Sequence, residues 1–271
     1  MTPPARFSVQ DVDVRELSGL AELALTPTLA RAIWGETDRP EDAVLLHVVQ
    51  HIGGLVAGAF DAQGALQAYL VGLPTSEAGV QHSHRLGVHP GARRQGLGER
   101  LKRFQRDWCL SRGVHEVRWT FDPLLLANAH LNIHRLGATV RTLLPDYYGA
   151  MSGINAGLPS DRFEAHWQMD SERVEQQLNG QPETQSWPTT PALHPLEDRW
   201  PADLADAVAV EVPRDFAGLR RDDPELALDW RLKARELITT LFGLGYTLTD
   251  VNLGRSQYLF TRAPSHSGTP C

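Results

Sequence analysis

The sequence predicts a mixed α/β fold. Two kinds of segment follow one another along the chain. In one, apolar and polar residues alternate, as in strands; in the other, apolar residues recur every three or four positions, as in helices. Up to residue 170 the predicted order is strand, helices, hairpin, strand, helix, strand, helix, strand, strand. Hydrophobic residues make up 42% of the 271 positions and charged residues 22%, so the chain can bury a core.

The elements before residue 91 follow from periodicity and turn residues. They are a strand over 7–17, helices over 20–34, an apolar stretch over 43–52 whose first part is helix or loop, a hairpin with strands ending at 60 and covering 65–73, and a strand over 80–90. Residues 61–64 form the hairpin turn. The last strand stops at Pro90, because proline cannot donate to a sheet ladder.

The next segment predicts an amphipathic helix that Gly113 ends. Apolar residues at spacings of four, three and four form its buried face: Leu97, Leu101, Phe104 and Trp108. Three cations are expected to point to solvent: Lys102, Arg103 and Arg106. Beyond this helix we predict a strand over 115–121, a helix over 125–137 and strands over 138–144 and 162–169.

A second region begins after a proline-rich stretch. Residues 179–201 contain five prolines and little periodicity, which is typical of a linker. An apolar strand follows, then a helix with Asp223 as N-cap and Pro224 at its first position, and two final strands. We therefore predict four parts: a first domain over 1–170, a linker over 171–201, a strand–helix–strand–strand unit over 202–262, and a disordered tail over 263–271.

Two segments of the chain share one plan. "HRLGATVRTLLPDYYG" followed by "RFEAHWQM", and "FGLGYTLTDVNLG" followed by "SQYLFTRA", each run from a helix end through Leu-Gly to a strand, a loop and a strand. The likeness reflects either an internal duplication or the general appearance of such units.

The stretch "HPGARRQGLGERL", residues 89–101, has the chemistry of an anion-binding turn. A helix N-terminus offers unpaired N–H groups and partial positive charge. Gly96 and Gly98 allow a phosphate to approach the backbone, and Arg93 and Arg94 add charge. The Gly-Lys-Ser/Thr of a Walker loop is missing, and a dinucleotide fingerprint would need glycine where Leu101 stands.

This stretch resembles motif A of the GNAT N-acetyltransferases, Arg/Gln-x-x-Gly-x-Gly/Ala after a strand that ends in Val-x-Pro. "NAHLNIHRLGA" resembles motif B of the same family, and the order of elements over 7–170 also agrees with its fold. A narrower resemblance, to bacterial GNAT-related proteins with an extra C-terminal region, lies in "WTFDPLLLANAHLNIHRLGA", "YYG" and "GLPSDRF". The C-terminal unit is then a smaller α/β unit that could be a GNAT-like half.

The resemblance implies acetyl-CoA or another acyl-CoA as co-substrate, with its pantetheine beside the end of a strand and its pyrophosphate on the turn. The residues expected to bind it are Leu86, Gly87, Val88, Arg93, Arg94, Gln95, Gly96, Leu97, Gly98 and Asn128. The backbone N–H of Val88 is expected to polarise the thioester carbonyl, as in the family. Asn128 is expected to cap or orient its helix.

Acyl transfer to an amine needs a base and a proton donor for the leaving thiolate. His82 and His84, two residues apart on one strand, are either this base or half-exposed strand residues. The family's acid, a tyrosine four residues before the motif B glycine, is replaced by Ile133. Tyr147 and Tyr148 are the alternative donors.

Polar residues near two strand ends are candidates for binding the acceptor. Asp161 and Arg162 either pair with each other or bind an amine and an acidic acceptor, respectively, and Asp122 could face the cleft. The function predicted is N-acyl transfer to a small amine or amino-acid-like acceptor. Because the family acid is missing, a non-catalytic acyl-CoA-binding or sensing protein is the alternative.

Composition limits the other partners. The formal net charge of −7 argues against nucleic acid, and no segment suggests a signal peptide or membrane span, so we expect a cytoplasmic protein. The resemblance implies a bacterial protein, and monomer and homodimer both stay open. The two cysteines, Cys109 and Cys271, do not suggest a structural disulfide, and Cys109 looks inert. The 11 histidines are scattered, and no metal is expected.

Overall fold

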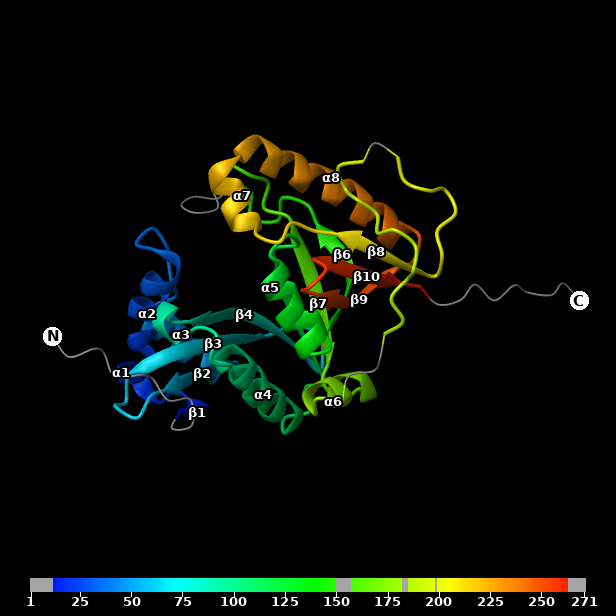
Figure 1. Cartoon of the computed structure of the whole chain (residues 1–271). Helices are drawn as coiled ribbons and strands as arrows, with labels where there is room; N and C mark the ends of the chain where they lie inside the picture. Colours follow the sequence, from blue (N-terminus) through cyan, green and yellow to red (C-terminus); the bar gives the residue numbers. More distant parts are fainter. Residues whose placement is uncertain (1–11, 150–156, 182–184, 198, 263–271) are drawn as a thin grey trace, which may run out of the picture. The chain divides into compact units, whose positions relative to one another are not determined.

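The computed structural model describes residues 12–149, 157–181, 185–197 and 199–262 (Figure 1). The chain forms two compact units. The first extends to Trp119 and includes 168–170, and the second comprises 120–167 and the chain from Ser171 on. The division that the sequence predicts, at residues 170 and 201, stays a prediction. The tail over 263–271 and the start of the first predicted strand lie outside the described residues.

The first unit is a mixed sheet with helices, as predicted. Its strands lie in the order β1 (Asp13–Glu16), β2 (Leu55–Phe60), β3 (Leu66–Pro74), β4 (Val80–Val88) and β5 (Glu116–Phe121). Neighbours from β1 to β4 are antiparallel, and β4 and β5 are parallel. The helices are α1 (Gly19–Leu23), α2 (Leu25–Trp34), α3 (Ala43–His51) and α4 (Leu97–Leu110), with a short 3₁₀ turn over Pro90–Ala92. The stretch over 43–52, left open above, is therefore helix.

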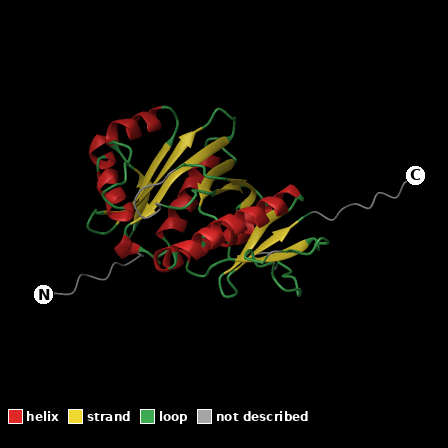
Figure 2. Ribbon diagram, turned by 90° about the horizontal axis from the view of Figure 1, so that it is seen from above, coloured by secondary structure: helices red, strands yellow, loops and turns green. Residues whose placement is uncertain are grey.

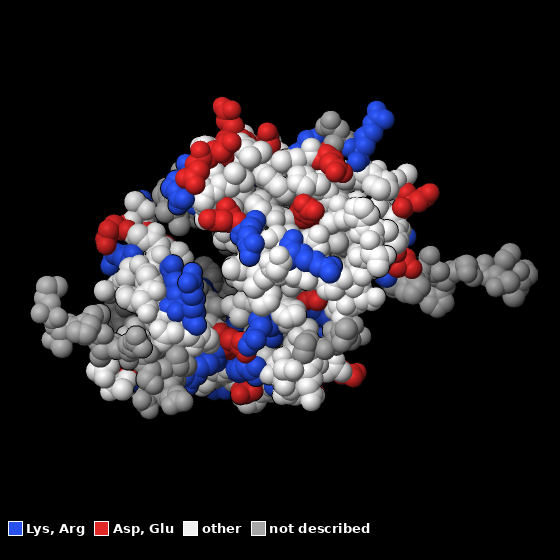
Figure 3. Space-filling view, viewed as in Figure 1, with Lys and Arg blue, Asp and Glu red and all other residues white. Residues whose placement is uncertain are grey.

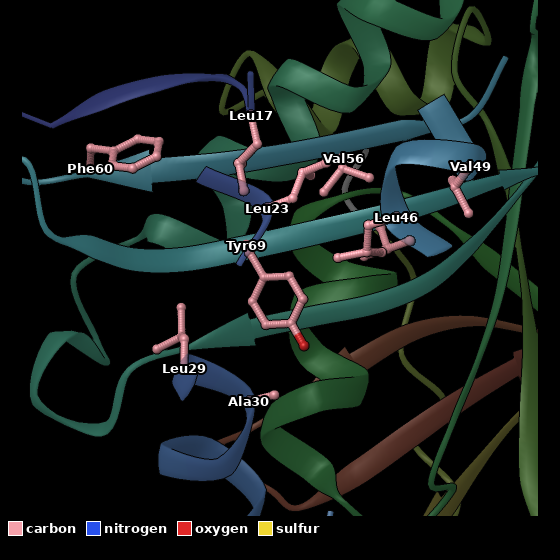
Figure 4. Packing of buried hydrophobic residues seen from close by; sticks show 10 residues of the cluster. Leu17, Leu23, Leu29, Ala30, Leu46, Val49, Val56, Phe60 and Tyr69 are labelled. Atoms are coloured by element: carbon pink, nitrogen blue, oxygen red, sulfur yellow. The ribbon is translucent and has the colours of Figure 1, made fainter. Parts of the chain in front are cut away.

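The core of this unit lies between the sheet and its first three helices. Figure 4 shows Val56 and Phe60 of β2 and Tyr69 of β3 beside leucines and other apolar residues of the helices. The helical residues of this cluster are Leu23, Leu29, Ala30, Leu46 and Val49. Burial of these side chains supplies the main driving force for docking the helices. It also fixes which face of β3 and β4 turns toward α2.

A β-bulge in β4 changes the direction of its side chains. Val71 of β3 lies opposite Arg85, but the next residue, Gly72, lies opposite Ser83, so His84 is the extra residue. Ser83 contacts α4, whereas Arg85 stacks over Trp34 of α2. Strict alternation would put residues 83 and 85 on the same face. The bulge therefore turns the end of β4 over, which periodicity alone does not predict.

Helix α4 confirms most of the predicted buried face but corrects one of its cations. Leu97, Leu101 and Trp108 are buried, as expected, whereas Phe104 is half-buried. Lys102, which was expected to point to solvent, is 1% exposed, so that expectation was wrong. Its Nζ donates to Ser83 Oγ (2.9 Å) and Gln105 Oε1 (3.1 Å) and lies 3.7 Å from the centre of the Trp119 ring. The buried face of α4 thus includes polar residues as well as the apolar ones.

The second unit holds the remaining strands in the order β7 (Arg162–Gln168), β6 (Thr139–Leu144), β9 (Thr247–Asn252), β10 (Gln257–Thr261) and β8 (Ala207–Glu211). Its helices are α5 (Leu126–Ala129), a π-helix over His130–Arg135, α6 (Glu172–Leu178), α7 (Phe216–Asp222) and α8 (Pro224–Gly243). The long helix α8 packs on β6 (Figure 2).

Helix boundaries in this unit include one confirmation and two omissions. Asp223 caps α8, its side chain accepting from the N–H of Leu226, as the sequence predicts. The predicted linker begins with α6, whose N-cap Ser171 accepts from the N–H of Val174. Helix α7, just before α8, was not predicted. Both missed helices have seven residues, too few to show a clear periodicity.

The shared plan of the two Leu-Gly segments extends to three dimensions. Gly137 and Gly245 end their helices with positive φ, 78° and 84°. The strands that follow carry their bulges at equivalent places, since Val140 and Leu248, the third residues after these glycines, stand at the register shifts. These two residues are also paired with each other, in antiparallel β6 and β9. The two segments therefore share the position of their bulges as well as their sequence plan.

Candidate active site

The anion-binding turn lies between β4 and α4. Arg94 and Gly96 have left-handed backbones, with φ of 64° and 75°, which bends the chain sharply into the helix. Among the described residues no side chain caps the first turn of α4, so its N–H groups are directed outward from the helix start. Arg93 and Arg94 are exposed. The turn therefore combines backbone donors, helix dipole and formal charge, which suits a diphosphate.

The edge of β4 that faces β5 is paired only at its beginning. The parallel register joins Val80 to Glu116, Gln81 to Val117 and His82 to Arg118. From Ser83 to Val88, β4 continues with no further pair in this register. The strand end thus presents backbone groups to an extended ligand, the arrangement by which peptides and similar chains add to a sheet edge.

His84, at the bulge, contacts a carboxylate from the segment between α2 and α3. Its Nε2 lies 2.7 Å from Glu41 Oε1. Burial would raise the pKa of Glu41, but the hydrogen bond with His84 and the nearby charge of Arg85 outweigh it and lower the pKa to about 2. Glu41 is therefore ionised at neutral pH and fixes the orientation of the imidazole, leaving Nδ1 as the nitrogen that can exchange a proton.

Arg85 fixes the loop that carries Glu41. Its guanidinium lies 3.0 Å from Asp38 and 2.9 Å from Glu41, and it stacks over the Trp34 ring at 4.9 Å. The hydroxyl of Tyr69 is buried nearby without a hydrogen-bond partner among the described residues, and burial raises its pKa. This acidic loop was not predicted as part of a site. "ETDRPED" carried the only signal, a concentration of carboxylates before a helix.

His82, the second predicted base, is half-buried on β4, and its ring centre lies 6.5 Å from that of His84. The structure thus brings the two histidines near each other. Leu86 and Val88 stand beyond the bulge, where Val88 lies opposite Ala68 of β3. The assignment of these residues to catalysis and cofactor binding stays a prediction.

The helix that resembles motif B is partly a π-helix, a local form common at functional sites. Ile133, at the place of the family's tyrosine, is fully buried. The side chain of Asn128 accepts a hydrogen bond from Asn132 (3.4 Å). His134 is held by Asp250 at 2.8 Å. Burial and the adjacent charges of His134 and Arg135 lower the pKa of His130 to about 4.

The two tyrosines proposed as proton donors lie in the turn after β6, in the second unit. Tyr147 and Tyr148 are 49% and 54% exposed and contact each other edge to face. The hydroxyl of Tyr148 lies 3.1 Å from Thr120 Oγ1, and its ring is 5.1 Å from the guanidinium of Arg162. Both are accessible to solvent.

Asp161 and Arg162 each contact a residue from elsewhere in the chain. Asp161 is 1% exposed, and both of its oxygens accept from Arg235 of α8, at 2.9 and 2.6 Å. Arg162 lies instead 3.6 Å from Asp122, which also binds Arg231 of α8 at 2.7 Å. Adjacent residues on a strand point to opposite faces, which explains why the neighbours take different partners. Arg231 and Arg235 were missed because the sequence places them on a helix that reads as apolar.

Charged side chains of both signs are spread over one face of the molecule. Figure 3 shows basic and acidic side chains interspersed on the face in view. Within the described residues, no three histidine, cysteine, aspartate or glutamate side chains are grouped to hold a metal ion. The buried Cys109 is a free thiol whose pKa burial raises to about 12. No helix in the described part of the chain is long and apolar enough to cross a membrane.

A mixed sheet, a bulged central strand and an anion-binding turn into a helix define the acyl-CoA N-acyltransferase class of fold, and the sequence-based expectation of that fold is confirmed. The family comparison agrees. Residues 23–137 match the model of the acetyltransferase (GNAT) family. No curated protein matches the chain in sequence.

Several solved structures are similar to part of the chain. YncA from Salmonella typhimurium, solved with acetyl-CoA, is 21% identical over 60% of this chain and 96% of its own, with a TM-score of 0.48. The ribosomal-protein-S18-alanine N-acetyltransferase of Escherichia coli is 18% identical over 60% of this chain and 98% of its own, with a TM-score of 0.48. An N-acetyltransferase from Staphylococcus aureus Mu50 is 11% identical over 59% and 99%, with a TM-score of 0.49.

Proposed function

We propose that the protein is an acyl-CoA-dependent N-acyltransferase that uses acetyl-CoA and acts on a small amine or amino-acid-like acceptor. The observation that carries the proposal is the uncapped N-terminus of α4, reached through left-handed Arg94 and Gly96. It stands directly after a strand whose end lacks further register pairs with β5. Both features suit the two ends of the coenzyme's linear chain.

The turn binds the pyrophosphate in this proposal. Backbone N–H groups around Gly96 and Gly98 donate to the phosphate oxygens, and Arg93 and Arg94 neutralise their charge. The end of β4, from Leu86 to Val88, hydrogen-bonds the pantetheine as an added strand would. Asn128 orients the motif B helix. When bound, acetyl-CoA supplies an acetyl thioester, the electrophile of the reaction.

His84 acts as the general base. A protonated amine cannot attack a carbonyl, so the acceptor must lose a proton before or during bond formation. The imidazole of His84 takes this proton on Nδ1, while Glu41 holds Nε2 and stabilises the resulting positive charge. The N–H of Val88 donates to the carbonyl oxygen as negative charge develops there. His82 is the substitute base on the same strand.

Protonation of the leaving thiolate is the step with no residue at the family's usual place, because that place holds buried Ile133. Tyr147 and Tyr148 are the proposed donors. The same substitution favours the second candidate function, an acyl-CoA-binding protein that does not transfer. In the transfer proposal, Asp122 and Arg162 hold the acceptor. Both carboxylate oxygens of Asp161 already accept from Arg235, so Asp161 is not proposed to bind the acceptor directly.

The proposal is tested by calorimetric titration with acetyl-CoA. Gly98→Asp places a carboxylate at the turn and should weaken binding at least tenfold, because it repels the pyrophosphate. Gly254→Asp, which adds the same charge in the turn between β9 and β10, is the control and should bind normally. Release of free thiol that depends on an added amine would support transfer. Binding without release for a broad amine panel would support the sensor, and no binding would refute both.

A further inference from the structure

A cavity of about 790 Å³ lies in the second unit, beside β8, the last strand in the order of the sheet. Ala209 and Glu211 of β8 and Gln257 of β10 line it, and the proline-rich segment 187–192 forms a further part of its lining. Cavities that hold small organic ligands typically measure about 300–1,000 Å³, so this one is large enough for such a ligand. The proposed function does not use it.

Backbone hydrogen bonds attach the proline-rich segment to β8. The N–H of Leu193 donates to the carbonyl of Ala209 at 2.8 Å, and the N–H of Glu211 donates to the carbonyl of Leu193 at 2.9 Å. Residues 209 and 211 are two apart on a strand and therefore share a face, and Gln257 of β10 stands directly opposite Glu211. The strand face and the attached segment thus keep fixed places around the cavity.

His194, which also lines the cavity, does not saturate the carboxylate of Glu211. Its Nδ1 accepts the N–H of Leu196 at 3.3 Å, which requires an unprotonated Nδ1, so the ring adds no charge to the cavity. Its Nε2 lies 3.8 Å from Glu211 Oε2, beyond hydrogen-bond distance. The imidazole also packs against Trp230 of α8, with ring centres 5.0 Å apart, and is thereby held in place.

The charged groups that line the cavity leave an excess of one negative charge. Glu197 and Glu211 contribute two carboxylates, and Arg255 contributes one guanidinium. Among the described residues, the Glu211 carboxylate has only the 3.8 Å contact with His194, and the charged groups of Glu197 and Arg255 have no ion pair. Two carboxylates without a close cation attract a positively charged ligand.

The rest of the lining favours an organic cation over a metal ion. Trp187, Pro188 and Pro191 contribute an indole and two apolar rings. Apolar side chains contact the body of an organic cation, and an indole ring attracts its charge, whereas a metal ion needs several close ligands. In the part of the chain that the structure describes, no three histidine, cysteine, aspartate or glutamate side chains form such a ligand group.

We propose that this cavity binds a small organic cation, an amine or a quaternary ammonium compound with an apolar body. Glu197 and Glu211 attract the charged group, and Trp187 and the neighbouring prolines contact the body. Arg255 opposes binding, because its charge has the same sign as that of the ligand. The proposal goes beyond the proposed function, since it gives the C-terminal region a ligand of its own and depends on neither acetyl-CoA nor acyl transfer.

The test is fluorine NMR of the full-length protein labelled with 5-fluorotryptophan and titrated with phenethylamine and with choline. Trp187→Phe identifies the Trp187 signal among those of the seven tryptophans. Each cation is compared with an uncharged molecule of similar shape, 2-phenylethanol and 3,3-dimethylbutan-1-ol, respectively. We expect both cations to shift the Trp187 signal saturably, at concentrations about tenfold lower than the alcohols need, because two carboxylates act on the charge.

Variants that change the charge of the cavity should give effects of opposite sign. Glu211→Gln and Glu197→Gln should each weaken phenethylamine binding about threefold, whereas Arg255→Gln should strengthen it about twofold. Glu225→Gln, at an exposed carboxylate in the first turn of α8, is the matched control and should bind as the native protein does. An unmoved Trp187 signal, equal binding of the alcohols, or unchanged binding in both E211Q and E197Q would overturn the site. A probe that binds only at the proposed acceptor site leaves the Trp187 signal unmoved, so the result is independent of the proposed function.

Discussion

Lys102 makes stability depend on pH in a way that can be calculated. Burial lowers its pKa from the ordinary value of 10.5 to about 7, because a hydroxyl, an amide oxygen and an indole ring replace water around the ammonium only in part. Between pH 7 and 10.5 the unfolded chain therefore binds more protons than the folded one. The free energy of unfolding must rise with pH across this window and be lowest below pH 7.

The size of this effect follows from the two pKa values. A shift of 3.5 pKa units, at about 1.4 kcal/mol per unit, sets an upper limit of about 5 kcal/mol on the destabilisation at low pH. The rise from pH 7 to pH 9 is smaller, about 2 kcal/mol, because pH 9 still lies below the ordinary pKa of 10.5 and part of the rise comes above pH 9. Lys102→Met removes the titrating group while keeping an unbranched side chain of similar length.

Urea unfolding at pH 7, 8 and 9 measures the effect. The free energy of unfolding of the native protein, less that of K102M, should rise by about 2 kcal/mol from pH 7 to pH 9. Other titrating groups, including Cys109, are common to both proteins and cancel in the difference. Arg103→Met, on the exposed side of the same helix, is the control and should give a constant difference. Parallel curves for native protein and K102M would refute the argument.

Three further predictions concern other contacts. Glu41→Gln removes the carboxylate from His84 and should lower kcat about 10- to 100-fold with little change in KM for acetyl-CoA, as measured by thiol release; an unchanged kcat would exclude His84 with Glu41 as the base. Asp223→Ala removes the cap of α8 and should cost about 1 kcal/mol in urea unfolding, whereas Asp223→Asn should restore most of it. Arg235→Met leaves Asp161 buried and unpaired, which should cost about 3–5 kcal/mol, and the double variant with Asp161→Asn should recover part of that loss; additive losses would contradict the pairing.

The strands and long helices were predictable because their periodicity reflects burial on one face. The hairpin, β4, α4 and α8 all appear at the expected places. The sharp turn into α4 was predictable too, since Gly96 allows the left-handed backbone at the helix start. Its binding of an anion stays a prediction. Helix α6 was not predicted because it is short and lies just before a proline-rich stretch that is typical of a linker. Ser171 and the acidic residues after it are nevertheless a signal for the start of a helix.

Buried charges could not be predicted from the pattern, because their partners come from distant segments. Lys102 has an oxygen of Ser83 within reach, and Arg231 has Asp122, separated by 109 residues. A helix face defined only by apolar residues leaves such cations out. Spacing alone contained a partial signal, since Arg231 lies three residues before Ala234 and four after Ala227, both buried. A cation at a core position is evidence for a distant anion or ligand.

The bulge at His84 shows how structure and site depend on each other. Before it, Ser83 turns toward α4 and accepts from buried Lys102; after it, Arg85 turns toward Trp34 and holds Asp38. Each anchor is polar and specific to one face, so the register of β4 cannot slip without leaving a buried group unsatisfied. His84 is thereby fixed at the one position where alternation fails, next to the strand end proposed to bind the pantetheine. Loss of the Lys102 contact should therefore affect the orientation of His84 as well as stability.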